Sequence, residues 1–261
     1  MLPLTSGNTR VKESRKLSRR SVRAERRLFL ADGPKAAEGA LALPGCVVEV
    51  YATPAAAEQY AALAAAGPAW TLVDDKALAS LSDSVTPAGV VALCRFVDRP
   101  LAHVLDREPR LVAICADVRD PGNAGTVVRC ADAAGADAVV FAGQSVDAYN
   151  PKTVRASVGS LFHLPLAVEP DPTAAVRAAQ AAGLTVLAAD GAGDVDLYES
   201  DELLARPTAW LFGNEAWGLP PELAELADHR VRIPIHGRAE SLNLSTAAAL
   251  CLYASAREQR R

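Results

Sequence analysis

The sequence has few of the residues that build metal sites and disulfide frameworks, and it has no long hydrophobic run. Its 261 residues include five cysteines and four histidines, without a Cys-x-x-Cys pair and with the histidines far apart. We therefore expect no metal and interpret the cysteines as reduced core thiols. No run approaches the roughly eighteen apolar residues of a membrane span, and no apolar stretch follows the N-terminal arginines as in a signal peptide. The expectation is a cytoplasmic protein without a membrane partner.

The charge of the chain is small in total but uneven along its length. The formal net charge is −4. Ten of the 27 Lys and Arg residues lie between Arg10 and Lys35, whereas only four of the 31 Asp and Glu residues occur up to Glu38. A basic segment beside an acidic remainder is typical of nucleic-acid binders, because phosphate contacts supply affinity whatever the base sequence. A solvated basic helix explains the same charges equally well, so both interpretations stay open.

The N-terminal part predicts a small α/β domain behind a basic helix. Strands that alternate with helices at this spacing indicate an α/β layer domain. The segment 98–109 contains two prolines and mixed charge, which is typical of a linker. We therefore expect one domain over residues 1–97, a linker over 98–109 and a second domain over 110–261. The expected helices cover 14–29, 55–66 and 75–81, and the expected strands cover 47–51, 70–73 and 89–93.

The C-terminal part repeats the alternation of strands and helices. Its strands are apolar without polar alternation, which predicts a mostly parallel sheet covered on both faces. The expected fold class is therefore α/β in both parts of the chain. The expected strands cover 111–115, 138–141, 163–168, 184–188, 208–212 and 230–233, and the expected helices cover 126–134, 151–160, 172–182 and 244–257.

Three short segments in this part place glycine or proline beside polar side chains, at the carboxyl ends of predicted strands. The first is Asn123-Ala124-Gly125-Thr126-Val127-Val128-Arg129, and the second is Leu211-Phe212-Gly213-Asn214-Glu215. The third combines Ile233-Pro234 with Glu240-Ser241-Leu242-Asn243-Leu244-Ser245, which opens the last helix. Ligands of open α/β sheets bind at the carboxyl ends of the strands. The three segments together therefore predict one ligand site.

In this order and spacing, the segments resemble the motifs of the SpoU/TrmH branch of the SPOUT superfamily of RNA 2′-O-ribose methyltransferases. The resemblance covers residues 110–261. It implies a trefoil knot in the C-terminal domain, S-adenosyl-L-methionine as the methyl donor and RNA as the substrate. By their matching positions, catalytic roles are implied for Asn123, Arg129, Glu215, Ser241 and Asn243, and donor-binding roles for Gly213, Ile233 and Leu242.

Arg129 is chemically unsuited to act as a base in such a reaction. A guanidinium has a pKa above about 12 and stays protonated unless a phosphate or Glu215 takes the proton. A fixed cation that lowers the pKa of the ribose 2′-hydroxyl and holds the adjacent phosphate is the better interpretation. Without the resemblance, Asn123 would merely cap a helix and Arg129 would pair with a surface carboxylate. Capping by Ser241 or Asn243 is compatible with either interpretation.

Three further side chains have two interpretations each. Lys152 and Arg155 lie three residues apart and share a face at the start of a helix, where they either meet RNA phosphates or face solvent. Trp217 is either a core residue or an aromatic surface on which a base stacks. The residues alone do not decide between these alternatives.

The size and position of the N-terminal domain favour 23S-type rRNA as the substrate, because rRNA-directed relatives carry a substrate-binding domain there. A tRNA 2′-O-methyltransferase and a non-catalytic RNA-binding or ribosome-assembly factor are the alternatives. A nucleotide-binding oxidoreductase is excluded because no strand is followed by G-x-G-x-x-G. A homodimer is expected from the resemblance and from the apolar stripe of the closing helix. The stripe consists of Leu244, Ala248, Cys251, Leu252 and Ser255.

Overall fold

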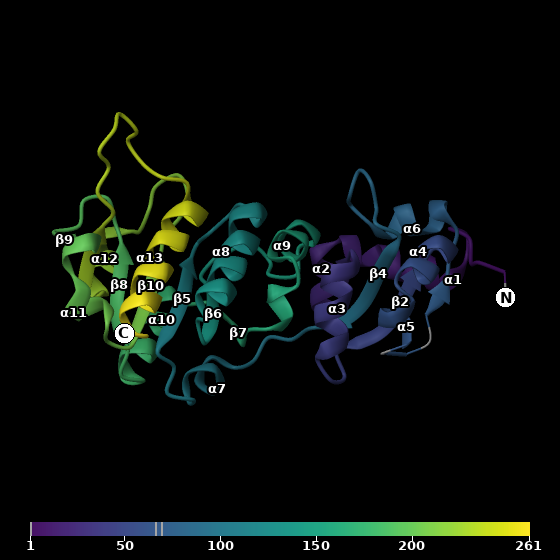
Figure 1. The fold of residues 1–261 in the computed structure, drawn as a ribbon, viewed down its shortest axis with the longest axis horizontal. Helices are drawn as coiled ribbons and strands as arrows, with labels where there is room; N and C mark the ends of the chain where they lie inside the picture. Colours follow the sequence, from purple (N-terminus) through teal and green to yellow (C-terminus); the bar gives the residue numbers. More distant parts are fainter. Residues whose placement is uncertain (1, 66, 69) are drawn as a thin grey trace. The chain divides into compact units, whose positions relative to one another are not determined.

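The computed structural model describes residues 2–65, 67–68 and 70–261, which divide into two compact units (Figure 1). The first unit is Met1–Val97 with Asp147–His163, and the second is Asp98–Val146 with Leu164–Arg261. The segment 147–163 joins the first unit because helix α9 (Pro151–Ser157) packs against strand β1 (Leu28–Asp32). The sequence pattern had placed this segment with the C-terminal part.

The first unit contains a four-stranded sheet in the order β1-β4-β2-β3. Strand β4 pairs antiparallel with β1 and β2, and β3 pairs parallel with β2. The predicted helix 75–81 is confirmed as α6, while Ala66, the predicted end of another helix, lies outside the described residues. The strands are β2 (Val47–Ala52), β3 (Thr71–Leu72) and β4 (Val90–Arg95) besides β1; the helices are α1 (Thr9–Arg15), α2 (Arg20–Arg26), α3 (Pro34–Ala42), α4 (Pro54–Gln59), α5 (Ala61–Ala65) and α6 (Asp75–Leu81).

The prediction of one basic helix over 14–29 is wrong. Two helices, α1 and α2, are joined by a short 3₁₀ turn, and the chain then continues as β1. The break has a packing reason, because Val11 and Leu17 enter the core of the first unit and are at most 2% exposed. Helix α2 ends at Arg26, and the capping residue Arg27 adopts a left-handed φ of 53°, which allows the apolar residues after it to enter the sheet as β1. The basic segment is therefore part of this unit's fold and not an appended arm.

The second unit contains a seven-stranded sheet in the order β7-β6-β5-β10-β8-β11-β9, in which every pairing is parallel. Strands β5, β6 and β10 are fully buried, which confirms the predicted α/β class and a parallel sheet covered on both faces at its centre. The trefoil knot stays a prediction. The strands are β5 (Leu111–Ala116), β6 (Ala138–Ala142), β7 (Leu166–Glu169), β8 (Thr185–Ala189), β9 (Val195–Asp196), β10 (Thr208–Phe212) and β11 (His229–Arg232).

Two groups of helices cover this sheet. Helices α8 (Pro121–Ala134) and α13 (Leu244–Glu258) pack against each other and against β5, as the teal and yellow helices of Figure 1 show. Helix α10 (Pro172–Ala181) packs against α7 (Leu101–Leu105) and α12 (Pro221–Leu226). The segment 98–109 was expected to be only a linker, but it contains α7, whose Val104 and Leu105 are buried in the core of this unit. Among the described residues, no helix is long and apolar enough to cross a membrane.

The apolar stripe of α13 packs inside the chain. Ala248, Cys251, Leu252 and Ser255 are fully buried, and Trp210 donates a hydrogen bond from Nε1 to Ser255 Oγ over 2.9 Å. The stripe cannot form a dimer contact, because it already covers the sheet and α8. The helical spacing correctly indicated a buried face, but it was wrong about which surface that face contacts.

Candidate functional site

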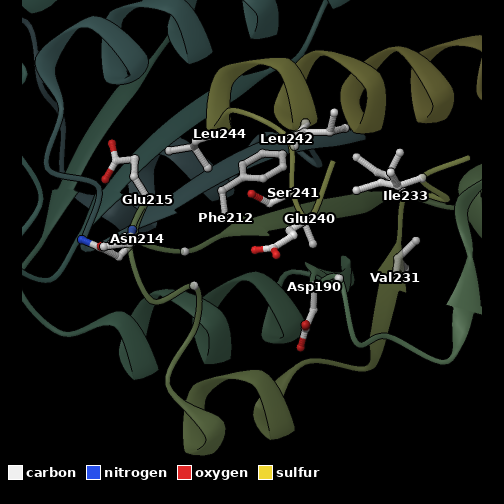
Figure 2. A pocket seen from close by; sticks show the side chains of 17 residues that line it. Asp190, Phe212, Asn214, Glu215, Val231, Ile233, Glu240, Ser241, Leu242 and Leu244 are labelled. Carbon is white, nitrogen blue, oxygen red and sulfur yellow. Dashed lines mark hydrogen bonds between the residues drawn. The ribbon is translucent and has the colours of Figure 1, made fainter. Parts of the chain in front are cut away.

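The second and third polar segments line a cavity of about 300 Å³ at the carboxyl ends of β8, β10 and β11 (Figure 2). The first segment is hydrogen-bonded to both of them. This is the edge at which parallel α/β sheets bind ligands, and the volume is at the lower end of the range for small-molecule sites. Apolar side chains dominate the wall, with a few polar groups among them. The lining residues include Asp190, Phe212, Gly213, Asn214, Glu215, Val231, Ile233, Glu240, Ser241, Leu242, Leu244 and Ala247.

The first segment is the opening turn of α8. The helix begins at Pro121 and not at Thr126 as predicted, because Asp120 caps it by accepting a hydrogen bond from the backbone N–H of Asn123 over 2.7 Å. Asn123 is therefore not the cap, and its side chain is available for other partners. Its Nδ2 donates to Glu215 Oε1 over 3.3 Å.

Glu215 is held as a carboxylate by the segment that precedes α8. The backbone N–H groups of Arg119 and Asp120 donate to its two carboxyl oxygens over 3.0 and 2.9 Å. Partial burial acts to raise the pKa of Glu215, but these backbone hydrogen bonds and the amide of Asn123 outweigh it, so the pKa lies below its ordinary value. Glu215 is therefore ionised at neutral pH and a weak base.

The second segment forms a tight turn in which Asn214 and Gly218 exchange two backbone hydrogen bonds of 2.9 Å. The Asn214 side chain donates to the carbonyl of Asp117 over 2.7 Å and accepts from the N–H of Ala216 over 2.8 Å. A Cβ at Gly213 would lie 2.4 Å from the carbonyl carbon of Gly218. The turn itself therefore requires glycine at position 213, independently of any ligand.

The third segment ends with Asn243, which has two functions in the structure. Its Oδ1 caps α13 by accepting from the N–H groups of Ser245 and Thr246 over 2.9 and 3.4 Å. Its Nδ2 donates to Asn123 Oδ1 over 3.0 Å. The helix-capping interpretation is thus correct for Asn243, and the same side chain also joins the third segment to the first.

Glu215, Asn123 and Asn243 form a continuous chain of hydrogen bonds, which we call the amide network. Gly213, Ile233 and Leu242 line the cavity, as their predicted donor-binding roles require. Glu215 and Ser241, for which catalytic roles are predicted, line it as well. Seven of the eight predicted site residues therefore belong to the cavity wall or to the amide network. Figure 2 shows Glu215 beside Asn214 at one end of the cavity and Ile233 at the other.

Arg129 is the predicted site residue that the structure does not bring to the cavity. It is exposed on α8, six residues after Asn123, and it forms no hydrogen bond or ion pair with the described part of the chain. The surface-pairing interpretation of Arg129 is therefore not supported. Its guanidinium is free to meet a ligand that approaches from outside.

The three residues with open interpretations differ in their surroundings. Trp217 is 62% exposed, which excludes a core position. Arg155 forms an ion pair with Asp83 within the first unit, so it is not simply solvated. Lys152 lies beside the side-chain cap of α9, where Asn150 accepts from its N–H over 2.9 Å.

Several site residues were missed from the sequence. Asp190 and Glu240 line the cavity, and Asp117 adopts a left-handed φ of 56° directly after β5, where its carbonyl receives the Asn214 side chain. Asp190 follows the end of β8, so its position at a strand's carboxyl end was an available signal. A Cβ added at Gly193 would lie 2.6 Å from the carbonyl oxygen of Arg230, so the close approach of these two backbone segments requires glycine there.

A parallel α/β sheet with an apolar cavity and a hydrogen-bonded polar network at one edge defines a protein that binds a small ligand beside a polar reaction site. The SpoU rRNA Methylase family matches residues 110–253, and an MRM3-like substrate binding domain matches residues 8–92. The chain belongs to the SpoU rRNA methylase family.

The similarity extends over nearly the whole chain. The 23S rRNA (guanosine(2553)-2′-O)-methyltransferase RlmP of Bacillus subtilis is 33% identical over 94% of this chain and 95% of its own. The structure of an rRNA methyltransferase from Sinorhizobium meliloti with bound AdoMet has a TM-score of 0.84 and 36% identity, and covers 96% of this chain and 95% of that chain. The structure of the SpoU methyltransferase AviRb from Streptomyces viridochromogenes with AdoMet has a TM-score of 0.86 and 31% identity, and covers 97% of this chain and 98% of that chain.

Proposed function

We propose that this protein transfers the methyl group of S-adenosyl-L-methionine to a ribose 2′-hydroxyl of 23S-type rRNA. The observation that carries the proposal is the amide network of Asn123, Glu215 and Asn243 beside a cavity of about 300 Å³. The network joins three segments that are far apart in the sequence, and it has no role in the hydrophobic core. Polar groups fixed by each other in this way are suited to orient a reacting hydroxyl.

The cavity fits the donor in shape and in chemistry. Phe212, Ile233 and Leu242 provide apolar surface for an adenosine, and Gly213 brings backbone into the wall. The carboxylates of Asp190 and Glu240 are compatible with a ligand of net positive charge. When bound, the donor's sulfonium supplies an electrophilic methyl group, so what the protein adds is alignment.

The polar side chains near the cavity have different roles in the proposed reaction. Asn123 and Asn243 orient the ribose, and Ser241 offers a hydroxyl at the cavity wall. Glu215 holds the start of α8 and Asn123 in place through its hydrogen bonds. Its lowered pKa makes it a poor proton acceptor, so we assign it this positioning role and not that of a base. Arg129 approaches the ribose and its adjacent phosphate, where a fixed cation lowers the pKa of the 2′-hydroxyl. The O–C bond forms as the S–C bond breaks, and the hydroxyl proton leaves to solvent.

The first unit supports rRNA rather than tRNA as the substrate. Its residues 8–92 match a substrate-binding domain, and the relative RlmP, which covers both units, is named as acting on 23S rRNA. Lys12, Arg15, Arg19 and Arg20 are exposed, and their side chains form no hydrogen bond or ion pair with other described residues. These four residues, which we call the free cations, are available for RNA phosphates.

Incubation with methyl-labelled donor and unmodified 23S rRNA tests the proposal. The expected product after digestion to nucleosides is a single 2′-O-methylnucleoside, with much weaker labelling of tRNA. Label found on a base would contradict ribose methylation. Label on tRNA but not on 23S rRNA would favour the tRNA alternative, and donor binding without any transfer would favour a non-catalytic RNA-binding factor.

We also propose that the protein forms a homodimer through the second unit. The stripe first considered for this contact is buried, but the opposite face of α13 exposes Leu250 and Tyr253 by 37% and 53%. Two-fold contacts are the commonest arrangement of oligomers. Light scattering of the wild type at micromolar concentration should give twice the chain mass of 27.3 kDa. A mass equal to one chain would contradict the dimer.

A further inference from the structure

The donor cavity has an unbalanced charge. Three carboxylates line it, those of Asp190, Glu215 and Glu240. None of the described residues in its wall is Lys, Arg or His. A cavity with this wall favours a cationic ligand over a neutral ligand of the same shape.

Two of the three carboxylates are compensated by neighbouring groups. Asp190 accepts two hydrogen bonds from the guanidinium of Arg230, over 2.9 and 2.7 Å. Glu215 accepts from two backbone N–H groups and from Asn123. Their negative charge is therefore partly neutralised before any ligand arrives.

Glu240 has no such compensation. It forms no hydrogen bond or ion pair with any residue the structure describes, and it lies in the exposed segment that leads to Ser241. Figure 2 shows its carboxylate among the lining side chains, between the apolar group around Phe212 and the Asp190 side chain. Arg238 is the nearest basic residue along the chain, and it is exposed and absent from the cavity wall. Glu240 is thus the uncompensated charge of the cavity.

We propose that Glu240 is a charge-selecting residue that makes the cavity prefer the methyl donor over the demethylated product. This inference rests on the proposed function, because it takes S-adenosyl-L-methionine as the ligand. The donor carries a sulfonium, an ammonium and a carboxylate, and its net charge is +1. S-adenosyl-L-homocysteine has lost the sulfonium charge and is neutral. The two ligands share nearly all other atoms, so a lone carboxylate is a means of distinguishing them.

The preference has a direct consequence for turnover. When the methyl group leaves, the cation that Glu240 attracts disappears, so the product is held less tightly than the donor was. An exposed carboxylate acting on one charge changes an affinity by about two- to fivefold. The effect should weaken as ionic strength rises, because exposed charges are screened over about 10 Å at 0.1 M salt.

Calorimetric titration of the wild type and the Glu240→Gln variant tests the proposal. The variant keeps the size of the side chain and removes its charge. We expect the affinity for S-adenosyl-L-methionine to fall about two- to fivefold at low salt, with little change for S-adenosyl-L-homocysteine. Sinefungin carries an ammonium group where the donor has its sulfonium, so its affinity should fall like that of the donor. Glu202→Gln is the matched control, because Glu202 is exposed in α11 (Asp201–Leu204), which precedes β10 and is distant from its carboxyl end.

Equal loss of affinity for donor and product would overturn the proposal, since Glu240 would then contact the ammonium group that both ligands carry. Unchanged affinities for all three ligands would overturn it as well. If the wild type binds none of the three ligands, the proposed function itself fails. In steady-state assays, the expected result is stronger product inhibition relative to the donor KM in Glu240→Gln.

Discussion

The charged and polar side chains of the two units are used differently. In the second unit, Asn123, Glu215 and Asn243 bind one another at the rim of a cavity, outside the hydrophobic core. In the first unit, Arg23 is 3% exposed and donates to Asp147 and to the carbonyls of Leu17 and Ser18, so it stabilises the fold.

The comparison shows why counting charges is a poor guide to RNA contacts. Of the ten basic residues between Arg10 and Lys35, Arg23 is buried, and Lys16 and Arg26 both pair with Glu13. Arg10 and Lys35 pair with Glu49 and Glu38, and Arg27 lies over the ring of Phe96. Among the described residues of this segment, that leaves the four free cations as exposed side chains without such partners. Removal of residues 1–27 would therefore not be a clean test of RNA binding, since it would also remove Val11 and Leu17 from the core.

The largest effect is expected for Arg129→Ala. We expect methyl transfer to fall by about 10²–10³-fold, because the variant loses the cation at the developing oxyanion. Donor affinity should stay within about twofold of the wild-type value, since Arg129 does not line the cavity. Single-turnover rates and calorimetry measure the two quantities separately. A loss of donor affinity as large as the loss of rate would contradict this role.

In the first unit, Arg23→Met should destabilise the fold strongly. The variant leaves the Asp147 carboxylate without its partner, and breaking a buried pair costs about 3–5 kcal/mol. Arg20→Met is the matched control and should change the free energy of unfolding by less than about 0.5 kcal/mol. Urea denaturation measures both values. Similar stability of the two variants would mean that the buried pair is not structural.

Asn243→Asp separates the two functions of this side chain. The carboxylate still accepts from the first N–H groups of α13, so thermal stability should change little. The donor to Asn123 Oδ1 is lost, and we expect methyl transfer to fall about tenfold. Asn243→Ala should lose both functions, with about 1 kcal/mol of stability. Wild-type rates in Asn243→Asp would show that the hydrogen bond to Asn123 is not needed for the reaction.

The free cations should affect RNA binding alone. Replacement of Lys12, Arg15, Arg19 and Arg20 by glutamine should weaken rRNA affinity and flatten its dependence on salt. Each lost contact should change the slope of log affinity against log salt by about 0.9 for a duplex or 0.7 for a single strand. Donor affinity is the internal control and should not change. An unchanged slope with normal methylation would mean that this surface is only solvated.

The smallest effect is expected for Glu215→Gln and depends on pH. Because the pKa of Glu215 is lowered in the folded chain, its stabilising contribution is present above the unfolded pKa of about 4.3 and disappears as pH falls through the lower folded pKa. The variant should therefore be less stable than the wild type at pH 7, and the difference should narrow towards pH 3. Urea denaturation at both pH values measures it. A difference that is constant with pH would show that the charge of Glu215 does not stabilise the fold.

The sequence was most informative where local chemistry decides the structure. Glycine, proline and amide side chains after apolar strands predicted that three segments lie together at one sheet edge, and the structure places them there because parallel strands bring their carboxyl ends together. Helix 75–81 was predicted correctly because Asp74 caps it by accepting from the N–H of Ala77. Both features depend on residues that are close along the chain.

Features that depend on tertiary packing were not predicted. The first two residues of strand β1, Leu28 and Phe29, were taken for the end of a helix, because arginines precede them and the partner strand β4 lies more than fifty residues away. The stripe of α13 was correctly recognised as apolar. Its spacing in the sequence does not show whether it packs against α8 of the same chain or against a second subunit. The role of Gly213 also depends on the backbone of Gly218, which a sequence motif does not reveal.

A double-mutant cycle between Asn123 and Asn243 tests whether the first and third segments act as one site. Single-turnover methyl transfer to 23S rRNA would be measured for Asn123→Ala, Asn243→Ala and the double variant, with donor saturating. Residues that act as a unit give non-additive losses. We expect the double variant to be about as slow as the slower single variant. Losses that multiply would contradict it, since the two side chains would then contribute independently.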